Sequence, residues 1–235
     1  MHIFQKGFNF GQDGPGNRLV YHLQGCNMKC IWCSNPEGMS ISGGKYFSVD
    51  ALLDECKRSR LMFYKGGGVT FTGGEATLQA EELLDLLKKL KEAEIHTALE
   101  TNGTSPRLME LLPFIDYLMM DFKHYDSDIL KKYTGMGNEQ TKRNYEKICG
   151  LNRQVHIRIP LINGINAQNP EAFAFAAYLA GYSNPNAVYE FLPYHEYGKE
   201  KWTQKYLVSD GFVTGETVAL FKKTFEEHGL KIIAT

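Results

Sequence analysis

Apolar positions recur along this chain in two patterns that alternate. Short apolar runs bounded by glycine or polar residues predict β-strands, and longer stretches with apolar residues three and four positions apart predict amphipathic helices. The clearest helix covers residues 78–93, where leucines line one side and Glu and Lys the other. Strands are predicted over residues 18–23, 68–71, 96–100, 117–121, 155–159 and 187–192, with a further one over 230–234. Helices are predicted over residues 49–63, 78–93, 105–112, 127–133, 139–151, 170–179 and 214–228.

This alternation of strand and helix favours a parallel sheet with helices outside it. Six strand–helix units fall short of a complete eight-stranded barrel of ~250 residues. We therefore predict an α/β fold, a partial, open (β/α)6 TIM-like barrel of parallel strands with helices outside. The chain contains no fixed-period repeat and no linker rich in Pro, Gly or Ser, so we expect a single domain over residues 1–235.

Composition narrows the class of protein. Apolar residues make up 43% and charged residues 23% of the chain, which is typical of a globular domain and excludes disorder. A net charge of −1 gives no reason to expect nucleic acid or a membrane surface as partner. No apolar run reaches the length of a membrane span, and the first residues lack a signal sequence, so we predict a cytoplasmic protein. Five cysteines, an odd number, argue against a secreted disulfide framework.

Three of the cysteines are clustered. Cys26, Cys30 and Cys33 follow the first predicted strand with the spacing C-x3-C-x2-C. Three thiolates on one loop can hold a soft metal centre, and a four-iron cluster with only three of its usual four Cys ligands keeps one iron open for a substrate or cofactor. The alternatives are a zinc site completed by a distant His and three cysteines that bind no metal and pack in the core. Cys56 and Cys149 lie in predicted helices and are interpreted as small buried hydrophobic residues.

Polar motifs follow each of the other predicted parallel strands. They are Thr72-Gly73-Gly74-Glu75, Glu100-Thr101-Asn102-Gly103, Asp121-Phe122-Lys123, Arg158 and His195. The carboxyl ends of barrel strands are where active sites are built, so we expect one site on this face. Each motif also has a structural alternative: a tight turn with Glu75 at a helix N-terminus, a salt-bridged strand end at Asp121 and Lys123, and a structural histidine at His195.

Taken in order, these motifs resemble a known family. The Cys spacing, with an aromatic residue before the third Cys, resembles the radical S-adenosylmethionine superfamily. Asp13-Gly14-Pro15-Gly16 near the start and Leu192-Pro193-Tyr194-His195 with Gly198 and Lys199 near the end narrow the resemblance. Along its whole length the chain looks like the glycyl-radical-enzyme activating enzymes, closest to the pyruvate formate-lyase activating type.

The resemblance implies ligands for each group. A single [4Fe-4S] cluster would be bound by Cys26, Cys30 and Cys33 in a cluster loop over residues 25–36. The 39 residues between Cys33 and Gly73 leave no room for a ferredoxin-like insert. S-adenosylmethionine would contact Trp32, Ser34, Gly73, Gly74, Glu75, Asp121, Phe122, Lys123, Arg158 and His195. Na⁺ or K⁺ would be held by Glu100, Thr101, Met119 and Asp121. The partner's glycyl loop would contact Asp13, Gly14, Pro15 and Gly16.

The implied activity is activation of a glycyl radical enzyme. S-adenosylmethionine is cleaved reductively, and the resulting 5′-deoxyadenosyl radical takes a hydrogen atom from a backbone glycine of pyruvate formate-lyase or a related lyase. No side chain need act as acid or base. Flavodoxin or ferredoxin would supply the electron, and we expect a monomer. Two alternatives are a radical enzyme that acts on a small molecule and a zinc-stabilised binding module without catalysis.

Overall fold

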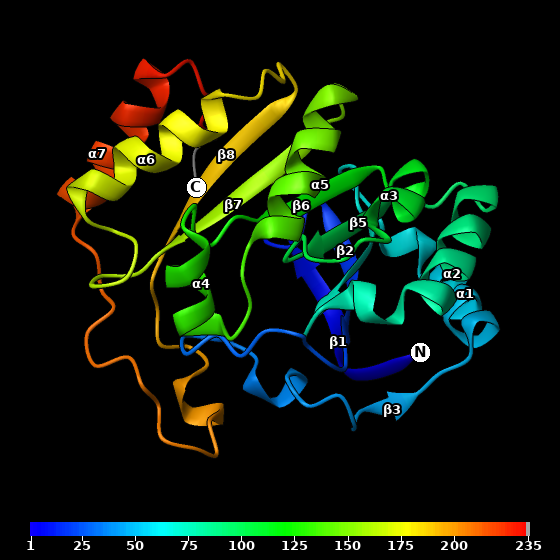
Figure 1. The fold of residues 1–235 in the computed structure, drawn as a ribbon. Coiled ribbons are helices and arrows are strands. Elements are labelled where there is room, and N and C mark those ends of the chain that lie inside the picture. The colour runs from blue at the N-terminus through cyan, green and yellow to red at the C-terminus, as the bar shows by residue number, and fades with distance from the viewer. Residues whose placement is uncertain (234–235) are drawn as a thin grey trace. The chain divides into compact units, whose positions relative to one another are not determined.

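The computed structural model describes residues 1–233, in which strands and helices alternate from β3 (Lys45–Tyr46) onward except where two helices follow one strand (Figure 1). They form two compact units. The first consists of Met1–Asn27, Asn35–Thr101 and Ser105–Met119, and the second consists of Met28–Ser34, Asn102–Thr104 and the chain from Met120 onward. Strand β6 (Tyr117–Asp121) contributes its first three residues to one unit and its last two to the other. The cluster loop is divided in the same way, after Asn27.

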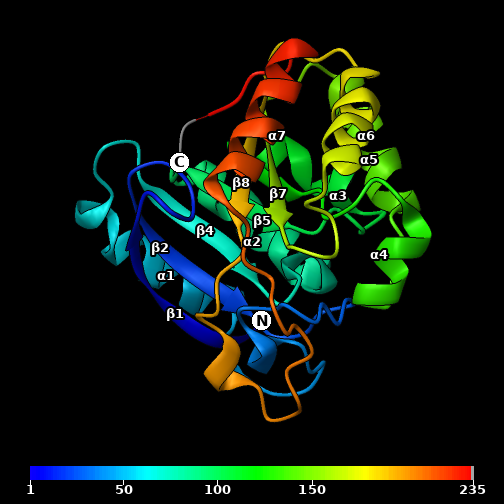
Figure 2. The same ribbon diagram turned by 90° about the vertical axis from the view of Figure 1, so that its left-hand side faces the viewer.

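Besides the start of β6, the strands of the first unit are β1 (His2–Phe10), β2 (Asn17–Leu23), β3 (Lys45–Tyr46), β4 (Gly68–Gly73) and β5 (Thr97–Thr101). Their pairing combines a parallel core with an antiparallel edge. β2 pairs with β4 in parallel, from Arg18 opposite Gly68 to Leu23 opposite Gly73, and β4 pairs with β5 in parallel. β1 runs antiparallel to β2 (Figure 2), and it also pairs antiparallel with β3.

The helices of the first unit are α1 (Val49–Arg58), α2 (Ala80–Glu92) and α3 (Leu108–Leu111). The α2 helix buries the leucine stripe that predicts it, with Leu83, Leu86, Leu87 and Leu90 all inaccessible to solvent. Ser48 begins α1 as its N-cap, and its hydroxyl accepts a hydrogen bond from Ala51 N. The apolar pattern therefore specifies both the helices and the face that each one buries.

The second unit pairs β7 (Val155–Leu161) with β8 (Ala187–Pro193) in parallel. Its helices are α4 (Ser127–Thr134), α5 (Glu139–Gly150), α6 (Asn169–Ala180) and α7 (Gly215–Glu227). The α6 and α7 helices lie alongside β7 and β8 in both views (Figures 1 and 2). An aromatic core joins them, in which Phe191 of β8 packs edge-on against Phe221 and Phe225 of α7.

The six predicted parallel strands correspond to β2, β4, β5, β6, β7 and β8. The apolar pattern does not predict β1, because only Ile3 of its nine residues is buried. The helix expected over 49–63 ends at Arg58 and is followed by a separate 3-10 turn over Arg60–Met62. Of the strand expected over 230–234, the structure forms one bridge, between Tyr189 and Ile232, and Ala234 lies outside the described residues.

The longest helices have 13 residues, and within residues 1–233 none has the length and apolar character that crossing a membrane requires.

Candidate functional site

The first part of the cluster loop is held by backbone hydrogen bonds in the first unit. Gly25 N donates to Gly38 O at 2.9 Å, and Cys26 N donates to Met39 O at 3.3 Å. The Gln24 side chain adds a bond from Nε2 to Ser40 O at 2.7 Å. The backbone at Cys26, just after β2, is therefore held in place by the segment that follows the cluster loop.

The second part of the loop belongs to the second unit and is fastened on two sides. Lys29 N donates to Thr134 O at 2.7 Å and Ile31 N to Tyr133 O at 3.2 Å, so both neighbours of Cys30 are bonded to the end of α4. On the other side, Trp202 Nε1 donates to Cys33 O at 3.1 Å. Cys33 N donates to Cys30 O at 3.1 Å, which places these two cysteines on one turn.

The aromatic residue of the Cys motif has a packing role. Trp32 and Ile31 contact a small apolar cluster of Ile162, Tyr194 and Val208. A Cβ atom on Gly198 would lie 2.4 Å from Ser34 Cα, so the chain after β8 crosses the loop closely at Ser34. Trp32 and Ser34 thus anchor the loop whether or not they also touch a cofactor.

The donor set of the loop suits an iron–sulfur cluster. It offers three soft thiols, two of them half-buried and Cys30 buried, on a backbone fixed by hydrogen bonds. In the described part of the chain, no three or more His, Cys, Asp or Glu side chains are already arranged around a metal-ion position. The other two cysteines differ in character, because burial raises the pKa of Cys149 and raises that of Cys56 to about 12. Both therefore remain protonated packing groups.

The turn after β4 packs directly against the start of the cluster loop. Gly73 has φ +123°, and a Cβ atom there would lie 2.2 Å from Leu23 N; one on Gly74 would lie 2.2 Å from Gly25 O. Gly74 N donates to Leu23 O and Glu75 N to Gly25 O, at 2.9 and 2.7 Å. Both glycines are thus required by close backbone approach.

The Glu75 carboxylate is buried and engaged within the protein. Its Oε1 accepts hydrogen bonds from Thr77 N at 3.1 Å, Thr77 Oγ1 at 2.5 Å and Thr101 Oγ1 at 2.7 Å. It caps the 3-10 helix Ala76–Gln79, which is the structural alternative expected for this motif. A role toward a cofactor stays a prediction.

Glu100 and Thr101 lie beside the same turn. Thr72 Oγ1 donates to Glu100 Oε2 at 2.8 Å, so β4 and β5 carry linked polar groups at their carboxyl ends. Met119 is buried in β6. Of the predicted cation ligands, the first unit therefore brings Glu100 and Thr101 together with the motif around Glu75.

Asp121, Phe122 and Lys123 have distinct environments in the second unit. Lys123 Nζ donates to the Asp121 carboxylate, which matches the salt-bridged strand end expected as the alternative. The Phe122 ring is fully buried and stacks on Tyr178, and Phe122 N donates to Arg158 O at 2.9 Å. If Phe122 contacts a cofactor, it therefore does so through its backbone atoms.

Arg158 has a partner that the apolar pattern does not reveal. Its Nε lies 3.3 Å from Glu190 Oε2, and His156 Nε2 lies 2.9 Å from the same oxygen. Although burial raises the pKa of the Glu190 carboxyl, His156 and Arg158 together lower it overall. Arg158 and Glu190 are directly opposite in the β7–β8 register, so each is visible in the sequence as a charged residue in an apolar strand, but their pairing follows only from the register.

His195 stacks on Tyr197 with ring centroids 4.3 Å apart, and burial lowers its pKa. Its Nδ1 accepts a long bond from Tyr197 N at 3.4 Å. The ring is neutral at pH 7 and half-exposed, as a group that faces a bound molecule would be.

Asp13-Gly14-Pro15-Gly16 precedes β2 and so lies at the amino end of that strand, whereas Cys26 follows the carboxyl end of β2, and Gly73 and Glu100 lie at the carboxyl ends of β4 and β5. Thr70 Oγ1 donates to Asp13 O at 2.7 Å, and Asn9 Nδ2 donates to the Asp13 carboxylate. Arg18, fully buried, donates to Pro15 O at 3.1 Å. Residues of β1, β2 and β4 therefore hold the loop in place by hydrogen bonds. In the sequence, Arg18 stands out as a single arginine in an apolar strand, and this is the feature that indicates its role.

Known proteins are similar to this chain over most of its length. The family model described as the radical SAM superfamily matches residues 20–177. The pyruvate formate-lyase 1-activating enzyme of Escherichia coli (strain K12) is 35% identical over 231 residues, which cover 94% of this chain and 93% of that protein.

Two solved structures are also similar. A domain of the pyruvate-formate lyase-activating enzyme from Bacteroides vulgatus has 28% identity and a TM-score of 0.60, covering 72% of this chain and 98% of that chain. A radical SAM methyltransferase from Sphaerobacter thermophilus has 16% identity and a TM-score of 0.71, and the match covers 97% of this chain and 68% of that chain. The second likeness concerns the fold alone. Together they confirm the predicted α/β fold, an open, partial barrel of parallel strands.

Proposed function

We propose that this chain activates a glycyl radical enzyme, because it belongs to the radical S-adenosylmethionine superfamily and, within it, to the pyruvate formate-lyase-activating enzymes. Membership of the superfamily implies a [4Fe-4S] cluster and S-adenosylmethionine as cofactors. The observation that carries the proposal is the C-x3-C-x2-C loop, fixed on both sides, in a chain whose likeness to these activating enzymes extends over nearly its full length.

Cys26, Cys30 and Cys33 are the proposed cluster ligands. When held by these residues, the cluster would supply one-electron reductive cleavage of the sulfonium of S-adenosylmethionine, with methionine as the leaving group and the partner's glycine as the source of the hydrogen atom that 5′-deoxyadenosine gains. The protein binds and orients the reactants and excludes water, and no side chain acts as acid or base. Support for the ligand assignment comes from donor type, spacing and the high pKa of the two remaining thiols.

The proposed S-adenosylmethionine site combines the polar groups at the carboxyl ends of the strands. Glu75 and the backbone of Gly73 and Gly74 would accept from its amino group, and Arg158 would hold its carboxylate or ribose. The ring of His195 would lie against the adenosyl part. The remaining proposed contacts are Trp32, Ser34, Asp121, Phe122 and Lys123.

A monovalent cation, Na⁺ or K⁺, is proposed beside the cofactor, with Glu100, Thr101, Met119 and Asp121 as ligands. The Thr72 hydroxyl already orients the Glu100 carboxylate. If the cation assists cofactor binding, replacing K⁺ by tetramethylammonium weakens S-adenosylmethionine binding in the wild type but not in Glu100→Gln. Equal weakening in both proteins, or none in either, contradicts this assignment.

The proposed protein partners are a glycyl radical enzyme and an electron donor. The glycyl loop of pyruvate formate-lyase or a related lyase would contact Asp13-Gly14-Pro15-Gly16, and flavodoxin or ferredoxin would supply the electron. The activating enzyme itself is proposed to act as a monomer in the cytoplasm.

The test begins with anaerobic reconstitution with iron and sulfide, followed by reduction with dithionite. We expect a paramagnetic resonance signal that changes when S-adenosylmethionine is added, formation of 5′-deoxyadenosine, and a glycyl radical on added pyruvate formate-lyase. Cys30→Ala should lose all three, and Cys56→Ala should keep them. Stoichiometric zinc with no such signal would overturn the proposal. Cofactor cleavage without a glycyl radical on any candidate lyase would overturn the partner class alone.

A further inference from the structure

Three lysines lie close in sequence to the backbone groups that hold Cys30, in a chain whose net charge is −1. Lys29 precedes Cys30 on the cluster loop, and Lys131 and Lys132 lie in the last turns of α4. All three are exposed, and none forms an ion pair within residues 1–233. We refer to Lys29, Lys131 and Lys132 as the lysine patch.

Backbone hydrogen bonds fix the patch to the cluster loop. Lys29 N donates to Thr134 O at 2.7 Å, and Gly135 N donates to Lys131 O at 2.8 Å as the left-handed C-cap of α4. The Thr134 hydroxyl bonds Leu130 O at 2.9 Å and Met136 O at 3.0 Å, so this helix end is closed by several bonds. A protein that docks here is therefore held against a rigid surface beside Cys30.

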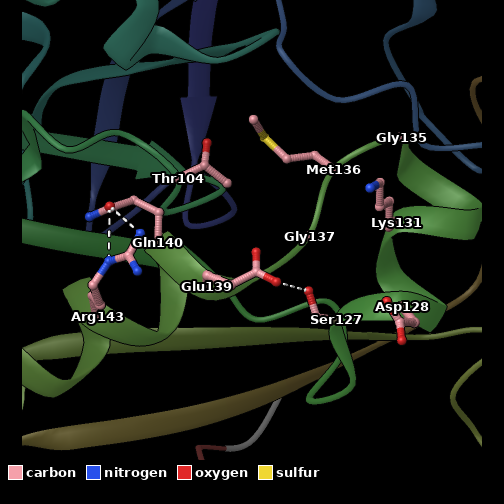
Figure 3. A pocket seen from close by; sticks show the side chains of 10 residues that line it. All are labelled: Thr104, Ser127, Asp128, Lys131, Gly135, Met136, Gly137, Glu139, Gln140 and Arg143. Carbon is pink, nitrogen blue, oxygen red and sulfur yellow. Dashed lines mark hydrogen bonds between the residues drawn. The ribbon is translucent and has the colours of Figure 1, made fainter.

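Carboxylates occur at the other end of the helix. A pocket of about 390 Å³ lies along α4 and the start of α5, and it contains Lys131 and Arg143 but also Asp128 and Glu139 (Figure 3). Glu139 accepts from the Ser127 hydroxyl, and Arg143 is bonded to Gln140 Oε1. With two groups of each sign the pocket itself selects no charged ligand. The basic character belongs to the end of α4, where Figure 3 shows Lys131 beside Gly135.

We propose that the lysine patch is the docking surface for an acidic one-electron carrier protein, which reduces the cluster through the side of the loop that carries Cys30. This inference rests on the proposed function. Exposed lysines without carboxylate partners complement surface carboxylates, steer a negatively charged partner and raise its association rate. One electron leaves the reduced carrier and enters the cluster, and no bond is made or broken.

The test compares two reductants on the reconstituted holoenzyme. In Lys131→Glu/Lys132→Glu, we expect reduction by an acidic flavodoxin to slow by about tenfold or more at low ionic strength. Reduction by dithionite, which needs no docking surface, should remain at the wild-type rate. The flavodoxin rates of the two proteins should converge as salt is raised, because screening removes the steering.

A matched control is available in the same unit. Lys222 and Lys223 form the same dipeptide on a helix, α7, and Lys222→Glu/Lys223→Glu should behave as the wild type. Binding of oxidised flavodoxin, measured by calorimetry, gives a second readout and should weaken about tenfold only in the α4 variant. Lys131→Gln/Lys132→Gln, which removes charge without reversing it, should give an intermediate loss.

Wild-type flavodoxin binding and reduction in the α4 variant would overturn the inference, as would equal losses in the α7 control. Failure of the proposed function is distinct, because the wild type would then form no 5′-deoxyadenosine even with dithionite.

Discussion

At the scale of single residues, Arg18 combines a charged side chain with full burial and several hydrogen bonds in the first unit. It is fully buried, and its guanidinium donates to Thr70 Oγ1 at 2.6 Å and Val69 O at 2.7 Å as well as to Pro15 O. Burial lowers its pKa to about 10, so it remains charged at pH 7. It is a positioning residue for the Asp13–Gly16 loop.

Replacing Arg18 by Met should therefore be costly. Buried acceptors would lose charge-assisted hydrogen bonds, and we expect the free energy of unfolding to fall by about 3 kcal/mol in urea titrations. Arg107→Met is the control, since Arg107 is partly exposed and forms a surface ion pair with Glu110, and it should change stability by less than about 0.5 kcal/mol. Similar effects of the two substitutions would contradict the anchoring role.

His124 gives a pH dependence whose sign can be worked out. It is buried, its Nδ1 accepts a bond from Asp126 N at 2.9 Å, and burial lowers its pKa despite nearby Asp126, with Lys142 acting in the same direction as burial. Below about pH 6.5 the unfolded chain takes up a proton at this histidine that the folded protein does not, so stability falls as pH falls.

The variant His124→Asn keeps an acceptor for Asp126 N but cannot titrate. Its free energy of unfolding should decline less between pH 7 and 5 than that of the wild type, as measured by denaturant titration at each pH. Parallel pH profiles for the two proteins would show that His124 does not contribute to the acid sensitivity.

At the scale of elements, the turn after β4 depends on the absence of side chains. A Cβ atom on Gly74 would meet Gly25 O at 2.2 Å, directly before Cys26. Gly74→Ala should therefore lower the thermal midpoint and also the iron content after reconstitution, because both backbones must move. Gly150→Ala, at the open end of α5, should be neutral or stabilise by up to about 1 kcal/mol. Wild-type iron content in Gly74→Ala would disprove the coupling.

Elements with a buried apolar face could be predicted from the sequence, and those without one could not. The leucines of α2 and the apolar runs of β4 and β7 reveal the type of each element and its position in the chain, because burial dictates where apolar residues occur. An exposed edge strand such as β1 leaves no such period. At the site, contiguous motifs such as the cysteines are visible in sequence. Pairs made by register, such as Arg158 with Glu190, require knowledge of which strands are neighbours.

At the scale of the whole molecule, the distribution of the five cysteines predicts one cluster for this chain. Cys56 is fully buried in α1, 3.6 Å from the Tyr21 hydroxyl, and Cys149 is buried near the end of α5. The raised pKa values keep both as thiols, whereas an iron ligand must be a thiolate. Neither belongs to a second group of cysteines in the sequence.

Anaerobic reconstitution should therefore load about four irons and four sulfides per chain. The paired variant Cys56→Ala/Cys149→Ala should load the same amount, although it loses stability through two small cavities, by about 1 kcal/mol each. Cys26→Ala, Cys30→Ala and Cys33→Ala should each lose most of the iron while the fold persists, because the hydrogen bonds that fix this loop are made by backbone atoms that alanine keeps. About eight irons in the wild type, or iron loss in the paired variant, would mean that a buried thiol is recruited as a ligand. The helix carrying it would then have to open on cluster binding, which far-ultraviolet circular dichroism of the apo and loaded proteins would detect.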